Sequence, residues 1–380
     1  MIGVPIARIF GIEIRVQLAW ILPLALVAVL AVDEIQTTSP ALDSLTAWGL
    51  GAMVAAAFFL SSLVHDLVHA VVARSRGITV SAIAVSFFGG STPLDPTAPN
   101  AADDLAIAVS GPLASLAIAG ASGVLAVVAA GLGGDLGLLA VPLVALLVLN
   151  AILGGINLVP AYPLDGGRIV RAIAWRRTGS EQSGWRAAVL TGRISGFAGV
   201  VIGLAILLFL GNTTDGAMIA LSGWFLILSA RTIKDRLRVD ELIGDLHVRD
   251  AMEPATITVH SGLTLDTFAS QLMEGTSGTT AVPVTEDDRV VGLVGLRQVN
   301  RLRRDKWPQT RVGDVMVKPP RLPLLSADDP LPTAVAGLQR ANVDGLPVLA
   351  DGRLVGLVTR PGVGKVVAER MPKVGSGRKL

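Results

Sequence analysis

The sequence predicts a polytopic α-helical membrane domain of about six spans with a short β segment, followed by an α/β domain built from an internal repeat. The first sign is composition: the 380-residue chain is 51% hydrophobic and only 16% charged, whereas soluble proteins carry about 25% charged residues. The second is that long apolar stretches fill the chain up to residue 230. The third is that short motifs recur in the more polar remainder.

Six apolar stretches are candidates for spans, because a helix needs about 20 apolar residues to cross a hydrocarbon core of about 30 Å. Arginine and lysine gather in alternate connections between them, and the other connections hold only acidic charges. The positive-inside rule therefore predicts that both termini are cytoplasmic. A composition rich in Arg, Ala, Gly and Val indicates a bacterial source, so we expect these spans to cross a bacterial plasma (inner) membrane. The stretches lie near residues 17–33, 48–73, 105–131, 136–158, 190–211 and 216–230.

The cysteine content and the net charge limit the chemistry. No cysteine is present, so disulfides, thiolate ligands and a cysteine nucleophile are excluded, and a metal site must use His, Asp or Glu. The net charge of +2 gives no reason to expect nucleic acid as a partner. The lipid bilayer is the partner that the composition does predict.

The second span contains two histidines in the sequence His-Asp-Leu-Val-His. His65 and His69 are four residues apart and therefore lie on one helical face, where both can bind one zinc ion. Alternatively, the two rings only satisfy each other or line a polar seam between helices. Ionisable residues inside spans are rare and usually functional, and two of the chain's four histidines are here. Zinc binding is therefore the favoured interpretation.

A third ligand is needed, because catalytic zinc usually binds three side chains and a water. Asp165 is the best candidate, since it lies in a Pro- and Gly-rich segment that closes the fourth span and breaks its helix. Alternatively, Asp165 only caps a helix over 166–177 at the membrane surface. The histidine pair favours the role of a ligand.

Together, these motifs resemble the site-2 protease family of intramembrane zinc metalloproteases. The resemblance rests on His-Asp-Leu-Val-His, then Ser-Gly-Pro at 110–112, then Asn-Leu-Val-Pro-Ala-Tyr-Pro-Leu-Asp-Gly-Gly at 157–167. It covers about residues 1–230, and we place the end of this domain at residue 235, giving 1–235. The resemblance implies one zinc per chain. The metal ligands that it implies are His65, His69 and Asp165.

The resemblance also implies how the site works. Residue 66 is the general base of the family, and Asn157 would help to orient or stabilise the reacting carbonyl. Residues 78–94 are apolar and β-branched, contain a Gly-Gly pair and are too short for a span, which predicts a strand or hairpin on the cytoplasmic side. They resemble the re-entrant strand region of the family, which presents substrate in extended form. The expected substrates are single-span membrane proteins, cut in regulated intramembrane proteolysis.

One residue of the candidate site departs from the family pattern, and this departure leaves two possibilities for catalysis. The family has Glu at the position of Asp66, whose carboxylate is one methylene shorter. Asp keeps the chemistry of a base, but a misplacement of about 1 Å can lower a rate about 100-fold. We therefore expect a slow endopeptidase, with a catalytically silent membrane scaffold as the alternative. A transporter regulated by the C-terminal repeat is a third hypothesis, although the chain shows no repeated membrane halves.

The C-terminal part is a duplicated unit. Val-Arg-Asp-Ala-Met at 248–252 is matched by Val-Gly-Asp-Val-Met at 312–316, and two later strand-like segments are matched at the same offset. Each unit is predicted to run strand, helix, strand, strand, helix. The units resemble CBS domains, which we place at 245–308 and 309–370.

The predicted repeats lack part of the nucleotide motif of CBS domains. That motif has a Ser or Thr followed three residues later by Asp, which bind phosphate and ribose. Here the Asp positions hold Gln298 and Gly362, and the hydroxyl survives only as Thr359, since the first unit has Gly295. We therefore expect a folded dimerisation or docking module in place of an adenine-nucleotide site.

Overall fold

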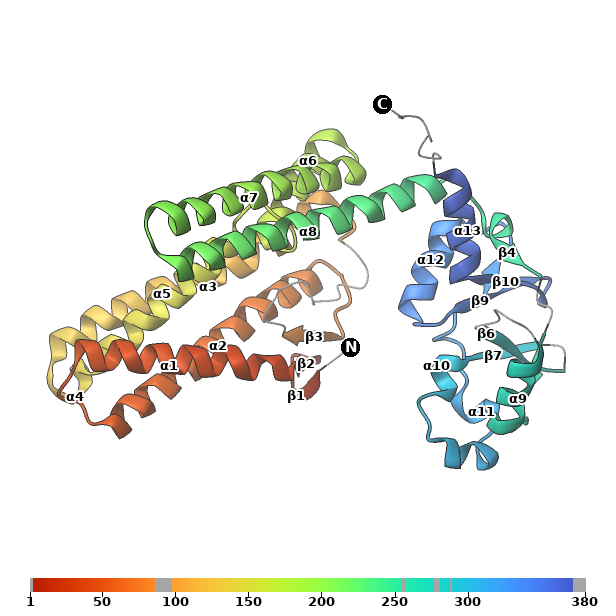
Figure 1. Cartoon of the computed structure of the whole chain (residues 1–380), viewed down its shortest axis with the longest axis horizontal. Coiled ribbons are helices and arrows are strands. Elements are labelled where there is room, and N and C mark those ends of the chain that lie inside the picture. Colours follow the sequence, from red (N-terminus) through yellow and green to blue (C-terminus); the bar gives the residue numbers. More distant parts are fainter. Residues whose placement is uncertain (1–2, 86–97, 255–256, 276–280, 288, 372–380) are drawn as a thin grey trace. The chain divides into compact units, whose positions relative to one another are not determined.

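The computed structural model describes residues 3–85, 98–254, 257–275, 281–287 and 289–371. The chain forms two compact units, Met1–Asp235 and Arg236–Leu380 (Figure 1). The first unit is helical with one small sheet, and the second is a mixed α/β unit. This agrees with the predicted fold class.

Six helices of the described chain are long and apolar enough to cross a membrane, as predicted. The last of them is longer than the predicted span, because the helix continues past Arg231 into polar sequence. The short 3-10 helix η1 and two further helices complete the unit. The bounds are η1 Leu18–Trp20, α1 Ile21–Thr38, α2 Ser44–Ser75, α3 Ala101–Leu132, α4 Gly134–Gly137, α5 Ala140–Asn157, α6 Asp165–Thr178, α7 Glu181–Phe209 and α8 Thr213–Ile243.

Local sequence signals fix where these helices begin and end. The Asp43 carboxylate accepts the Thr46 N–H at 3.0 Å and so caps α2, and Asn100 accepts the Asp103 N–H at 2.9 Å and caps α3. Helix α6 ends at Gly179, whose φ of 70° is favourable only without a side chain. Single residues therefore set where α2 and α3 begin and where α6 ends.

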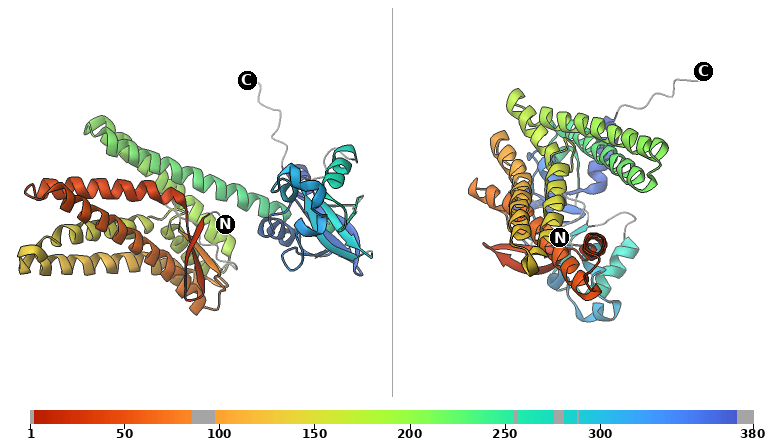
Figure 2. Two further views of the ribbon diagram at one scale, coloured as in Figure 1. Left: turned by 90° about the horizontal axis from the view of Figure 1, so that it is seen from below. Right: turned by 90° about the vertical axis from the view of Figure 1, so that its left-hand side faces the viewer.

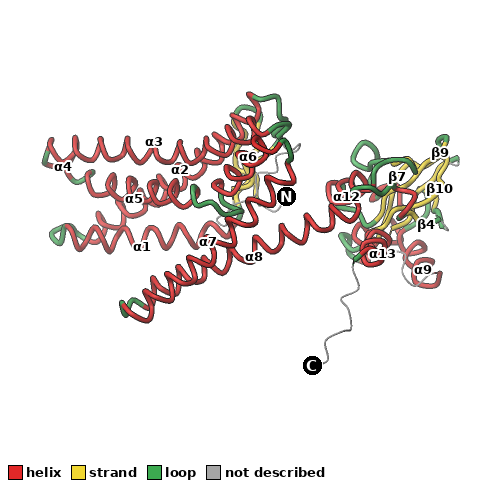
Figure 3. Tube along the Cα trace, turned by 90° about the horizontal axis from the view of Figure 1, so that it is seen from above, coloured by secondary structure: helices red, strands yellow, loops and turns green. Residues whose placement is uncertain are grey.

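A three-stranded sheet lies at one end of the helices (Figure 3). Strands β1 Val4–Ile9 and β2 Ile12–Val16 form an antiparallel hairpin, and β3 Ala82–Val85 adds to β2 in parallel. Strand β3 lies within the predicted β segment, whose residues 86–94 are outside the described residues. The N-terminal hairpin was missed, although the alternating Ile12 and Ile14, both fully buried, indicate a strand.

Helices α7 and α8 lie side by side as an antiparallel hairpin (Figure 2). Their backbones touch at glycines: a Cβ on Gly196 would be 2.7 Å from the Gly223 carbonyl oxygen, and one on Gly203 would be 2.3 Å from the Ala220 nitrogen. Small residues allow this approach, which larger side chains would prevent. The hairpin is therefore a tightly packed pair with a defined register.

The second unit confirms the predicted order of strand, helix, strand, strand, helix in both repeats. One sheet has the order β5-β6-β7, and the other has the order β4-β10-β9-β8, so a strand at the start of the first repeat pairs with the second repeat. Two buried apolar clusters form the core of this unit, and each combines residues of both repeats. The bounds are η2 Val248–Asp250, β4 Met252–Glu253, β5 Val259–His260, α9 Leu265–Gly275, β6 Ala281–Glu286, β7 Arg289–Gly295, α10 Leu296–Val299, η3 Arg304–Gln309, α11 Val312–Val315, β8 Leu325–Ser326, α12 Leu331–Arg340, β9 Gly345–Ala350, β10 Arg353–Thr359 and α13 Arg360–Arg370.

Candidate metal centre

The two histidines of α2 face the interior of the membrane unit. His65 and His69 are each only 5% exposed, and their ring centroids are 5.0 Å apart. Residues four apart share a helical face, so one turn of α2 brings both rings to one point. Buried imidazoles inside a span need polar partners, because lipid and apolar side chains offer none.

The partner common to both rings is Asp165, the first residue of α6. Its Oδ2 lies 3.2 Å from Nε2 of His65 and 3.1 Å from Nε2 of His69. One donor atom from each of the three residues lies within 4.8 Å of the others, and all three residues are buried. The structure therefore brings together the three predicted ligands, although about 100 residues separate Asp165 from the histidines.

The Gly-Gly that follows Asp165 allows this placement. A Cβ on Gly166 would be 2.2 Å from the Val159 carbonyl oxygen, and one on Gly167 would be 2.3 Å from the Tyr162 nitrogen. Such distances are below any real contact of a Cβ atom. Glycine at both positions therefore lets α6 begin directly against the end of α5, and this start sets the position of the carboxylate.

The outer nitrogens of the two rings are held by α3. Nδ1 of His69 donates to the Ile107 carbonyl at 2.6 Å, and Nδ1 of His65 is 2.9 Å from Oγ of Ser115. A carbonyl only accepts, so the proton of a neutral His69 is on Nδ1 and the lone pair of Nε2 points at Asp165. Hydrogen bonds of this kind orient metal-binding histidines.

This arrangement fits a metal ion. A neutral His69 sets an acceptor nitrogen against an acceptor carboxylate oxygen, and this conflict is relieved by a cation between them or by an imidazolium. In tetrahedral zinc sites with bonds of about 2.0–2.1 Å, neighbouring ligand atoms are about 3.3 Å apart. The observed separations of 3.1 and 3.2 Å are close to that value. The donor set of two imidazoles and a carboxylate is also one that zinc accepts.

Gly111 of α3 faces the same point, and sequence reasoning gave it no role. A Cβ at this position would be 2.2 Å from Nε2 of His69 and 2.7 Å from Nε2 of His65. Only glycine leaves the space in front of both nitrogens open. The Ser-Gly-Pro motif at 110–112 was the signal that could have indicated it.

A buried ion pair ties α6 to α3 beside the cluster. Asp104 is fully buried, and its carboxylate binds Arg171 through two contacts, from Nε at 2.9 Å and from Nη2 at 2.6 Å. Arg168 adds a third contact at 3.3 Å. The Arg171 guanidinium also lies 4.4 Å from the ring centroid of Trp185 on α7. Because Asp165 begins the same helix as both arginines, the pair holds α6 against the helix that carries Gly111.

Comparison with known proteins identifies the family. A model of peptidase family M50 matches residues 122–198. The "Putative zinc metalloprotease Rip3" of Mycobacterium tuberculosis is 30% identical over 367 residues, which cover 96% of this chain and 93% of that protein. The chain belongs to peptidase family M50.

Other comparisons describe the extent of this likeness. The "Zinc metalloprotease MJ0392" of Methanocaldococcus jannaschii is 25% identical to this chain over 354 residues. These residues cover 93% of this chain and 92% of that protein. The solved structure of the site-2 protease from the same organism is 26% identical and covers 60% of this chain and 94% of that one, with a TM-score of 0.37. A CBS domain model matches residues 248–305 and 312–363. Both resemblances drawn from the sequence are confirmed.

Two predicted residues of the M50 chain lie outside the three-residue cluster. Asp66 follows His65 on α2, is half-buried and has no hydrogen-bond partner within the described part of the chain. Asn157 ends α5, and its amide nitrogen donates to the Leu153 carbonyl at 3.0 Å. The structure records no contact between Asn157 and the described residues of the cluster, so its predicted role stays a prediction.

Proposed function

We propose that this M50 chain is a zinc-dependent intramembrane endopeptidase that hydrolyses peptide bonds of single-span membrane proteins in regulated intramembrane proteolysis. The observation that carries the proposal is the buried cluster of His65, His69 and Asp165 inside a unit of membrane-spanning helices. Three such donors leave one position of a tetrahedral zinc for water, which is typical of a catalytic site and supports one zinc per chain.

The chain's own residues would divide the chemistry as follows. Zinc bound by the cluster would lower the pKa of a water ligand and polarise the scissile carbonyl. Asp66 would take the proton of the attacking water and deliver it to the leaving amine, for which its unengaged carboxylate is suited. Asn157 would donate the second hydrogen of its amide to the reacting carbonyl, since Leu153 uses only one. Ser115 and the Ile107 carbonyl would keep both rings oriented.

The direct test uses purified full-length chain in detergent. We expect about one zinc per chain, slow cleavage of a helical single-span substrate, and loss of cleavage when zinc is removed by a chelator. The alternative of a silent scaffold, motivated by Asp in place of Glu, predicts bound zinc and bound substrate without cleavage. Membership of family M50 argues against the transporter hypothesis.

The topology and the domain boundaries are part of the proposal. The protein is a multi-pass membrane protein, and we place it in a bacterial plasma membrane with both termini cytoplasmic. Reporter fusions after residues 40, 134 and 213 should report the outside, and a fusion after 240 the inside. The protease domain is assigned to 1–235 and the CBS repeats to 245–308 and 309–370, boundaries that limited proteolysis would test.

The CBS pair is proposed to act as a dimerisation or docking module. A Cβ on Gly362 would be 2.9 Å from the Ala251 carbonyl oxygen, so the Asp of the nucleotide motif has no room here without movement. The surviving Thr359 hydroxyl accepts the Gly362 N–H at 3.0 Å and caps α13. Both features argue against tight binding of adenine nucleotides.

A further inference from the structure

The register of the α7–α8 hairpin brings basic residues from both helices to one level. A Cβ on Gly192 of α7 would be 3.6 Å from the Ala230 Cβ of α8. The next residues along the chain are Arg193 and Arg231, which therefore lie at about the same depth. This level is about midway along both helices, well removed from their connecting turn at 210–212.

Three cations line a pocket at this level. Arg193, Arg231 and Lys234 surround a cavity of about 200 Å³ together with one carboxylate, that of Asp235. Among the described residues, none of the three cations makes an ion pair or a hydrogen bond. The arginines of α6 differ, since Arg171 is fully engaged with Asp104. The pocket thus keeps an excess of two positive charges, and the cations repel one another unless an anion enters.

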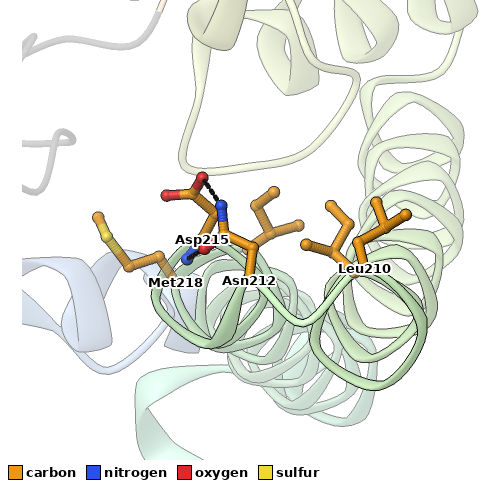
Figure 4. A pocket seen from close by; sticks show the side chains of 6 residues that line it. Leu210, Asn212, Asp215 and Met218 are labelled. Atoms are coloured by element: carbon orange, nitrogen blue, oxygen red, sulfur yellow. Dashed lines mark hydrogen bonds between the residues drawn. The ribbon is translucent and has the colours of Figure 1, made fainter.

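The pocket lies where the lipid-facing surface of the hairpin ends. Large apolar side chains are exposed on both helices directly beyond it, including Ile194 and Phe197 on α7 and Leu228 on α8. At the connecting turn, a second pocket is lined by Asn212 and Asp215, which cap α8, and otherwise by apolar side chains (Figure 4). An apolar face that ends in unpaired cations matches a molecule with acyl chains and an anionic head group.

We propose that the α7–α8 basic pocket binds the phosphate group of an anionic membrane phospholipid, with the acyl chains along the exposed faces of α7 and α8. Guanidinium groups match the geometry of phosphate, and basic pockets between membrane helices are suited to phospholipid head groups. A soluble phosphate would make the same polar contacts but would gain nothing from the apolar faces. The assignment does not depend on the protease activity.

The test compares two double variants of the full-length chain. Arg193→Gln/Arg231→Gln removes two cations of the pocket, and Arg176→Gln/Arg177→Gln removes two exposed arginines at the end of α6 that have no partner among the described residues. Each protein is placed in nanodiscs of phosphatidylcholine with a minor fraction of phosphatidylglycerol. The phosphatidylglycerol retained after mild detergent extraction is then counted by native mass spectrometry.

We expect retained phosphatidylglycerol to fall about fivefold or more in the pocket variant and to stay within about twofold of wild type in the α6 variant. Equal losses in both variants would show diffuse surface charge and overturn the proposal, as would no loss in either. Arg193→Lys/Arg231→Lys keeps the charge and should retain the lipid, which guards against a folding defect. Displacement of the lipid by millimolar inorganic phosphate would also overturn the proposal, because it would assign the pocket to a soluble anion.

Discussion

The two units of the chain place their charged residues in opposite environments. In the membrane unit Asp104 of α3 is fully buried against Arg171 of α6, the helix that begins with Asp165. In the repeat unit the pair of Arg303 and Asp305 has side chains that are 84% and 61% exposed. Removing one partner of a buried pair costs about 3–5 kcal/mol, whereas an exposed pair contributes about 0–1 kcal/mol. The buried pair of the membrane unit is therefore expected to matter far more for stability than the exposed pair of the repeat unit.

The largest effect is expected at Asp66. Asp66→Asn should lower cleavage at least about 100-fold while zinc stays bound, because the amide cannot accept a proton from water. Turnover and zinc content, measured on the same preparation, check this expectation. Asp66→Glu should change the rate in either direction, and the sign shows which carboxylate length the site accommodates. An Asn variant that cleaves like wild type would remove Asp66 from the mechanism.

A smaller but distinct loss is expected at Gly111. Gly111→Ala sets a methyl group 2.2 Å from the His69 nitrogen, so zinc affinity should fall by about 10–100-fold as the ring is displaced. Gly120→Ala on the same helix is the control, because a Cβ there meets nothing within 4 Å. Titration with zinc in the presence of a competing chelator measures the zinc affinity of both variants. Equal affinities would mean that α3 does not shape the site.

The comparison of the two units is tested directly by their ion pairs. Asp104→Asn should lower the free energy of unfolding by about 3–5 kcal/mol, because the Arg171 guanidinium loses its buried counter-charge. Asp305→Asn makes the same chemical change in the exposed pair and should leave stability almost unchanged. Unfolding of the full chain in mixed micelles measures both. Similar losses of stability in the two variants would show that the buried and the exposed pair do not differ in strength.

The smallest effect is expected from adenine nucleotides. Calorimetry of the full chain with AMP or ATP should show no binding in the micromolar range, because Gly362 stands where a ribose-binding Asp would be required. Micromolar affinity would show that the repeats use other groups and would restore a nucleotide-sensing role.

Sequence patterns predicted the parts of this molecule that depend on local periodicity. Hydrophobic length predicted the spans, and the spacing of His65 and His69 predicted that both rings share one face of the candidate metal site. What the patterns could not supply was contact between distant elements. The Ser-Gly-Pro motif marks Gly111 but does not say which side chains it faces, and nothing local to Asp104 indicates that Arg171 lies opposite. The extension of α8 was not predicted, because the apolar stretch ends near residue 230 and the helix continues to Ile243.

The distance along the chain between the metal-site residues has a consequence for biosynthesis. His69 and Asp165 are 96 residues apart, with two complete spans between α2 and α6. A chain made from its N-terminus therefore inserts both imidazoles into the membrane well before the carboxylate has left the ribosome. Until α6 is in place, α2 can offer a metal only two of the three donors. The three-residue cluster thus forms late, and the proposed proteolytic activity cannot arise in a truncated nascent chain.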